Sequence, residues 1–107
     1  MPLEGRAGPA EARSAAALER PDLYVVARFL EALWREEGRR KRTELQAAVR
    51  LNYDVYRKYL AWLVDKDLVR VAPDAEGVDQ VAITPRGLEA YHQLVAWIKD
   101  TVGTERL

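Results

Sequence analysis

The stretch Thr43–Leu68, TELQAAVRLNYDVYRKYLAWLVDKDL, constrains the fold of this 107-residue chain more than any other. Its apolar residues recur at helical spacing in two runs, which are separated by Leu51 and Asn52. Thr43 and Gln46 match a capping box, in which each side chain bonds a backbone N–H of the other residue. Asn52 is a good N-cap for the second run. The stretch therefore predicts two short helices joined by a tight turn, a helix-turn-helix.

Each predicted helix has one apolar face. The apolar face of the first helix contains Leu45, Ala48 and Val49. The apolar face of the second helix contains Tyr56, Tyr59, Leu60, Leu63 and Val64. The first two turns of the second helix leave four side chains on the outer face: Tyr53, Asp54, Arg57 and Lys58. In a helix-turn-helix, this part of the second helix contacts base edges and phosphates in the major groove.

Positive charge is concentrated on the same stretch, although the whole chain is neutral. Its formal net charge is zero, whereas nucleic-acid-binding domains are usually basic. Residues 39–58, however, contain seven basic and two acidic residues, a net charge of +5. The basic ones are Arg39, Arg40, Lys41, Arg42, Arg50, Arg57 and Lys58. This distribution places positive charge where phosphates would need it.

Four of these basic residues form the run Arg39-Arg40-Lys41-Arg42, directly before the first helix. A basic run is either a solvated loop or a clamp on the phosphate backbone. The amides and the dipole at a helix N-terminus also attract phosphate. Because the run leads directly into the predicted helix-turn-helix, we favour the clamp.

The chain is predicted to contain a tail, residues 1–20, and one domain, residues 21–103. The tail is alanine-rich from Ala10 to Arg20, and we expect it to be partly helical there. The chain has no apolar run of membrane-spanning length and no hydrophobic signal sequence, so we expect a cytoplasmic protein without a membrane partner.

The domain is predicted to begin with a helix from Leu23 to about Glu37. Asp22 is a suitable N-cap for it, and Gly38 suits the left-handed conformation that ends a helix. The residues at the spacing of one buried face are Val26, Phe29, Leu30, Leu33 and Trp34.

A β-hairpin, or wing, is expected after the helix-turn-helix. Leu68–Ala72 and Val78–Ile83 have strand character, and residues 73–77 have the composition of a turn. The fold class that follows is mainly helical with a small β-hairpin wing (α+β), a winged helix-turn-helix with a long C-terminal helix.

The C-terminal helix is predicted to begin at Pro85, with Thr84 as its N-cap, and to run to about Val102. Its second half carries more apolar surface than a small monomer would leave in water. The residues concerned are Leu94, Val95, Trp97, Ile98 and Val102. Because the apolar residues of this helix follow a 3-4 spacing, we expect a symmetric homodimer joined through residues 85–102. The alternative is that the first helix or the N-terminal tail covers this face within one chain.

Nothing in the sequence predicts an enzyme, a metal site or a cofactor. The chain has no cysteine, and its single histidine, His92, is accompanied only by Glu89 on the same helix. The wing carries Asp74, Glu76 and Asp79, which lack the spacing of a calcium loop and which phosphates would repel.

Two segments, LNYDVYRKYLAWLVDKDLV and AITPRGLEAYHQL, resemble the small archaeal winged-helix proteins. The matching positions are Leu51, Asn52, Tyr53, Tyr59, Leu60, Leu63, Lys66, Leu68, Thr84, Arg86 and Gly87. The resemblance covers roughly residues 22–102 and implies DNA binding as a dimer, with the last helix in a coiled coil. Two features depart from the family: Asp67 stands where glycine is usual, and the wing is acidic.

We therefore expect this chain to bind double-stranded DNA, either sequence-specifically or in the manner of a chromatin protein, as a homodimeric transcriptional regulator. The residues expected to contact DNA are Arg39, Arg40, Lys41, Arg42, Thr43, Asn52, Tyr53, Asp54, Arg57 and Lys58. The neutral net charge and the acidic wing favour the alternative, a winged helix that binds other proteins in a larger assembly.

Overall fold

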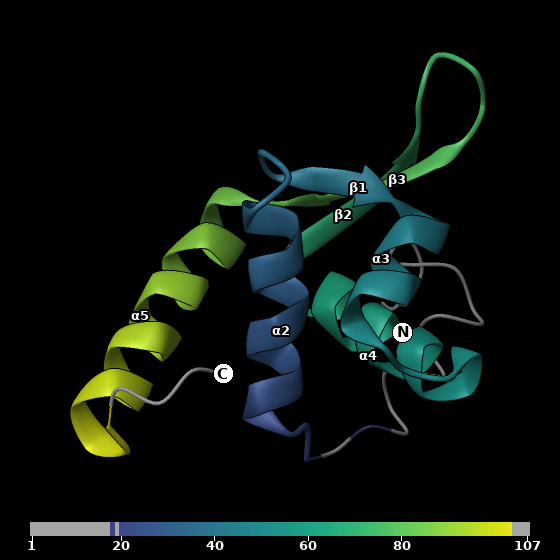
Figure 1. The fold of residues 1–107 in the computed structure, drawn as a ribbon. Coiled ribbons are helices and arrows are strands. Elements are labelled where there is room, and N and C mark those ends of the chain that lie inside the picture. Colours follow the sequence, from purple (N-terminus) through teal and green to yellow (C-terminus); the bar gives the residue numbers. More distant parts are fainter. Residues whose placement is uncertain (1–17, 19, 104–107) are drawn as a thin grey trace, which may run out of the picture.

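A computed structural model describes Leu18 and residues 20–103 of the chain (Figure 1). The elements are α2 (Leu23–Trp34), β1 (Arg39–Lys41), α3 (Arg42–Val49), α4 (Tyr53–Asp65), β2 (Val69–Pro73), β3 (Asp79–Ile83) and α5 (Pro85–Thr101). The three strands form an antiparallel sheet in the order β1-β3-β2. Figure 1 shows α2 between α5 on one side and α3 and α4 on the other, with the β2–β3 loop projecting beyond the sheet.

This arrangement confirms the predicted fold class, because helices dominate and β2 and β3 form the wing. The predicted tail, residues 1–20, lies outside the described residues except for Leu18 and Arg20. Over the described part of the chain, no helix combines the length and the apolar character needed to cross a membrane.

The strand β1 was not predicted, because three consecutive basic residues lack the alternation of a half-buried strand. In the structure, Arg40 lies opposite Val81 of β3. The chain reaches this position through a left-handed turn, in which Glu37 has φ 62° and Gly38 has φ 97°. The Gly38 amide donates to the Leu33 carbonyl (2.8 Å), so α2 ends at Trp34 rather than at the predicted Glu37.

The predicted capping box at Thr43 and Gln46 is wrong. Helix α3 begins at Arg42, and its N-cap is Lys41, which makes no side-chain capping bond. Because Lys41 is still paired with Gln80 in the sheet, the chain passes directly from strand to helix and places Thr43 inside the first turn. The predicted inward face is also only partly right, since Ala48 is exposed.

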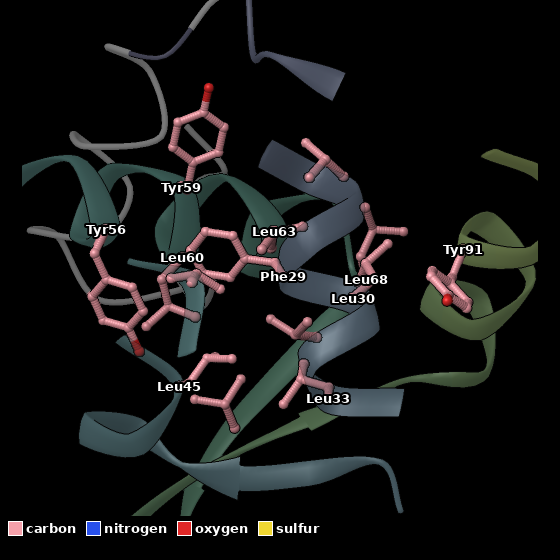
Figure 2. Close-up of a cluster of buried hydrophobic side chains, with 14 residues drawn as sticks. Phe29, Leu30, Leu33, Leu45, Tyr56, Tyr59, Leu60, Leu63, Leu68 and Tyr91 are labelled. Carbon is pink, nitrogen blue, oxygen red and sulfur yellow. The ribbon is translucent and has the colours of Figure 1, made fainter. Parts of the chain in front are cut away.

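The core lies where α2, α3 and α4 meet the sheet (Figure 2). Its centre is a row of aromatic rings: Phe29 of α2 stacks on Tyr56 (centroids 5.6 Å apart) and on Tyr59 (6.0 Å), both from α4. Leu45 and Val49 of α3 complete this core, as predicted. Trp34 was predicted to be buried, but it is 47% exposed and its ring rests on Tyr91 of α5 instead.

Thr84 joins the end of α4, the sheet and the start of α5. Its side-chain oxygen accepts a bond from the Gly87 amide (2.9 Å), which confirms the predicted N-cap. Its hydroxyl donates to the Asp67 carbonyl (2.7 Å), and its amide donates to the Leu68 carbonyl (3.1 Å). Asp67 takes the left-handed conformation (φ 63°), which aspartate tolerates better than most residues.

The first turn of α5 lies directly against this connection at Gly87. A Cβ at this position would collide with the Leu68 carbonyl oxygen and would approach Ile83 Cγ1 to 2.9 Å. The first neighbour is a backbone atom and the second is a side chain packed against the core. Neither can move without disturbing the attachment of α5 to the sheet.

Gly87→Ala is therefore expected to destabilise the fold by about 3 kcal/mol, because the overpacking outweighs the better helix propensity of alanine. Urea denaturation followed by circular dichroism measures the change. Glu89→Ala, an exposed position two residues later in the same helix, is the matched control and should be nearly neutral. A Gly87→Ala variant as stable as the control would show that this contact does not hold α5.

Candidate nucleic-acid interface

The second helix of the predicted helix-turn-helix, α4, begins as the sequence indicates. The Asn52 side chain accepts a bond from the Val55 amide (3.0 Å), which confirms the predicted N-cap. The helix then buries Tyr56, Tyr59, Leu60 and Leu63, as predicted, while Val64 is half-buried.

The outer face of the first turns of α4 carries an exposed aromatic ring and a small ion-pair cluster. Tyr53 is 59% exposed. The Asp54 carboxylate lies 3.3 Å from Arg57 Nη2 and 3.5 Å from Lys58 Nζ. Exposed pairs of this kind contribute little to stability, so phosphate or a base edge could replace Asp54 at small cost. The four residues predicted to face outward thus share one surface.

Two buried tyrosines orient α4 against the rest of the domain. The Tyr56 hydroxyl donates to the Arg42 carbonyl at the start of α3 (2.8 Å). The Tyr59 hydroxyl accepts a bond from the Asp22 amide at the start of α2 (2.9 Å). The angle of α4 to both preceding helices is therefore set by hydrogen bonds as well as by ring stacking.

The side chains of the basic run do not share one side of the domain. Arg40 turns toward α2, where Nε donates to the Ala32 carbonyl (3.2 Å) and Nη2 pairs with Glu36 (3.2 Å). Arg39 and Lys41 are exposed and alternate with Arg40 along the strand. Arg42 reaches the wing, where Nη1 lies 3.4 Å from the Asp79 carboxylate.

Arg42 instead joins two arginines from other elements around a hollow between α4 and β2. The hollow has a volume of about 390 Å³. Arg42 comes from α3, Arg57 from α4 and Arg70 from β2. We call it the arginine groove; its remaining lining residues are Leu60, Ala61, Val64, Val71, Ala72, Pro73 and Asp79. Sequence reasoning missed Arg70, although its position between Val69 and Val71 indicated an outward-facing residue of a strand.

Two of the three acidic residues of the wing, Asp74 and Asp79, have structural partners. The Asp74 carboxylate accepts bonds from the Val78 amide (2.9 Å), the Glu76 amide (2.8 Å) and the Gln80 side chain (3.2 Å). The backbone bond from Val78 contributes most to lowering the pKa of Asp74. Asp74 therefore shapes the turn, and Asp79 pairs with Arg42, so both have roles beyond the repulsion of phosphate expected from the sequence.

The five residues predicted to form a dimer seam on α5 differ in exposure. Trp97 is 56% exposed and Val102 is 52% exposed. Leu94 and Val95 are half-buried against the core. Ile98 is only 4% exposed within the single chain, so its prediction as an open seam residue is wrong.

His92, the single histidine, lies beside aromatic rings. His92 lies against the Trp34 ring in an edge-on arrangement, with centroids 6.5 Å apart. Across the described residues, no group of three or more His, Cys, Asp or Glu side chains could hold a metal ion.

Comparison with known proteins agrees with this architecture. A profile described as winged helix-turn-helix matches residues 19–101. Among solved structures, the fold is similar to that of "F93 from STIV, a winged-helix DNA-binding protein", with a TM-score of 0.65 and 16% sequence identity. That match covers 82% of this chain and 100% of the other. A search of curated protein sequences finds no significant match.

The Tyr56 bond predicts a specific loss of stability at high pH. Burial raises the pKa of Tyr56 from 10.0 to about 12, and the nearby Arg42 only partly opposes this. Between pH 10 and 12 the unfolded chain loses this proton while the folded chain retains it, so stability present below pH 10 falls across that range.

The Tyr56→Phe variant should be about 1 kcal/mol less stable than the wild type at neutral pH, because the Arg42 carbonyl loses its partner. Its stability should also decline less steeply above pH 10. Urea denaturation at a series of pH values measures both effects. Tyr24→Phe, at an exposed position of α2, should retain the wild-type slope. Burial also raises the pKa of Tyr91. Because Tyr91 is present in the wild type and in every variant, it does not account for a difference between their slopes. Equal slopes for the Tyr56 variant and the wild type would contradict this assignment.

Proposed function

This chain belongs to the winged helix-turn-helix family, and we propose that it binds double-stranded DNA as a transcriptional regulator in the cytoplasm, without enzymatic activity. The observation that carries the proposal is the convergence of Arg42, Arg57 and Arg70, from three separate elements, beside the exposed first turns of α4. Arginine is well suited to phosphate and to guanine edges because its planar fork donates two parallel bonds.

In this proposal, α4 enters the major groove with Tyr53, Asp54, Arg57 and Lys58 facing the bases. The exposure of Tyr53 and Asp54 and the weak ion pairs of Asp54 support this orientation. Asn52 and Thr43 lie close to the backbone of the duplex, at the starts of α4 and α3.

The arginine groove holds the phosphate backbone beside α4 in this arrangement. Arg39 and Lys41 add positive charge from β1. Arg40 acts on DNA only through its charge at long range, because its guanidinium is bonded to the Ala32 carbonyl and paired with Glu36.

A protein-binding module is the second candidate, and the same ion pairs favour it. Asp79 neutralises Arg42, and Asp54 neutralises part of the charge on α4. The net charge of zero also agrees with a domain that binds another protein rather than DNA. A direct binding measurement separates the two functions.

DNA binding is tested by fluorescence anisotropy with a labelled mixed-sequence duplex at several salt concentrations. Three neutralised phosphates would give a slope of about −3 in log K against log salt, since each contributes about −0.9. Arg57→Ala should reduce this slope by about one if Arg57 binds phosphate. If Arg57 instead reads a guanine, the variant should lose about 1–3 kcal/mol on the preferred sequence alone.

The matched control is Arg35→Ala, which removes the same charge from the exposed surface of α2, where Arg35 pairs with Glu31. It should leave affinity and salt slope unchanged. The absence of any binding to duplex DNA at low salt would reject the DNA function and favour the protein-binding module.

We also propose that the chain is a homodimer that presents two copies of α4 to one duplex. The support is the exposure of Trp97 and Val102 near the end of α5, where large apolar side chains otherwise face water. Leu94 and Val95, half-buried against the core, would border this contact. Ile98 would support it from within the chain.

Trp97→Glu should convert the dimer into a folded monomer with weaker DNA binding, because it would place a charge in the interface. Sedimentation equilibrium measures the mass, and circular dichroism verifies folding. Ile98→Glu is expected to unfold the chain instead, since Ile98 is buried without a partner subunit. A wild-type protein that sediments as a monomer at micromolar concentration would contradict the dimer.

A further inference from the structure

The arginine groove has two features that a phosphate-binding surface alone does not need. Five of its lining residues are apolar, and we call them its floor: Leu60, Ala61 and Val64 from α4, and Val71 and Ala72 from β2. On α4 the lining residues follow the spacing 57, 60, 61 and 64, which places them on one stripe of the helix. The groove thus combines an apolar floor with positively charged walls.

Its position explains why the floor stays open. In the order β1-β3-β2, strand β2 is the edge of the sheet, so one side of it pairs with β3 and the other side borders α4. Pro73 closes the end of this strand and contributes no backbone donor. The volume of about 390 Å³ falls at the lower end of the range for small-molecule pockets.

The charges of the groove select an anion. Three guanidinium groups and one carboxylate line it, so its net charge is positive. Arg42 and Asp79 are joined by a long contact of 3.4 Å, and the Asp79 side chain is about half exposed to solvent. A ligand carboxylate could replace Asp79 on Arg42 and accept two parallel bonds, which a guanidinium provides in the same geometry.

We propose that the arginine groove binds a small amphipathic organic anion, with a carboxylate on a flat apolar body. The carboxylate bonds Arg42 and Arg70, and the apolar body covers Leu60, Ala61 and Val71. Because Arg42 and Arg57 also belong to the surface proposed for DNA, the ligand and DNA compete. This second part rests on the proposed function, whereas binding of the anion does not.

The probe for the site is naphthalene-2-carboxylate, titrated into the full chain without DNA. Calorimetry measures affinity, and ¹H–¹⁵N NMR locates the site. The expected shifts centre on Ala61, Val64, Val71 and Ala72. Naphthalene-2-methanol lacks the charge, and acetate and inorganic phosphate lack the apolar body, so each should bind about tenfold more weakly or worse. Phosphate binding as tight as naphthalene-2-carboxylate binding would overturn the proposal, because the groove would then be a simple anion site.

Two variants test the floor and the walls separately. Arg70→Ala should weaken binding of the probe about tenfold, and Arg35→Ala, of equal charge change on α2, should not. Ala72→Phe adds a ring to the floor at an exposed strand position without changing charge, and it should abolish binding while the fold is retained. Unchanged binding by Ala72→Phe, with folding verified by circular dichroism, would place the probe elsewhere and reject the site.

Competition is measured last, by adding naphthalene-2-carboxylate to the complex with duplex DNA. The wild type should release DNA, whereas Ala72→Phe, assayed at a protein concentration that binds the same fraction of DNA, should not. If the probe binds but the chain does not bind DNA, the proposed function fails and the ligand site stands. If DNA and the probe bind at the same time without affecting each other's affinity, the proposed competition is wrong.

Discussion

The hydroxyl of Thr84 is the contact on which the arrangement of this domain most depends. It donates to the Asp67 carbonyl and accepts from the Gly87 amide, so one buried side chain connects the exit of α4 to the entry of α5. The Thr84 amide adds a bond to Leu68 where β2 begins. A buried polar group with all its bonds made is stable, whereas one that loses a partner is costly. The wing therefore leaves the helix-turn-helix at a defined angle.

The opposite end of α4 is held by aromatic side chains rather than by a single polar group. Phe29 stacks on Tyr56 and Tyr59, and their hydroxyls bond to the backbone at the starts of α3 and α2. With both ends of α4 held, the separation of α4 from the β2 edge is set by the core. That separation creates the arginine groove, which belongs to neither element alone.

The electrostatics of the proposed interface depend on weak pairs. Asp54 holds Arg57 and Lys58, and Asp79 holds Arg42, at contacts of 3.3 to 3.5 Å on partly exposed side chains. Such pairs keep long cationic side chains in place without binding them strongly. A phosphate or a carboxylate could take over the same guanidinium groups. A chain with no net charge can therefore present a locally cationic surface, and a small anion and DNA would compete for it.

The sequence by itself determined the features that depend on neighbours in the chain. Asp22, Asn52 and Thr84 cap their helices as predicted, because a cap needs only an amide two or three residues away. The apolar stripes of α2 and α4 were recognisable for the same reason, and with them the winged-helix fold class.

Only the tertiary structure decided the features that depend on distant partners. Arg39–Lys41 became a strand because β3 offers an edge, and that pairing moved the start of α3 away from Thr43. Ile98 is buried, although its helical spacing predicted an exposed residue. Trp34 is half exposed, although its spacing predicted burial. Arg70 joined Arg42 and Arg57 only when β2 came to lie beside α4. Local pattern shows which face of an element is apolar, but the element that covers it is set by packing among residues far apart in the chain.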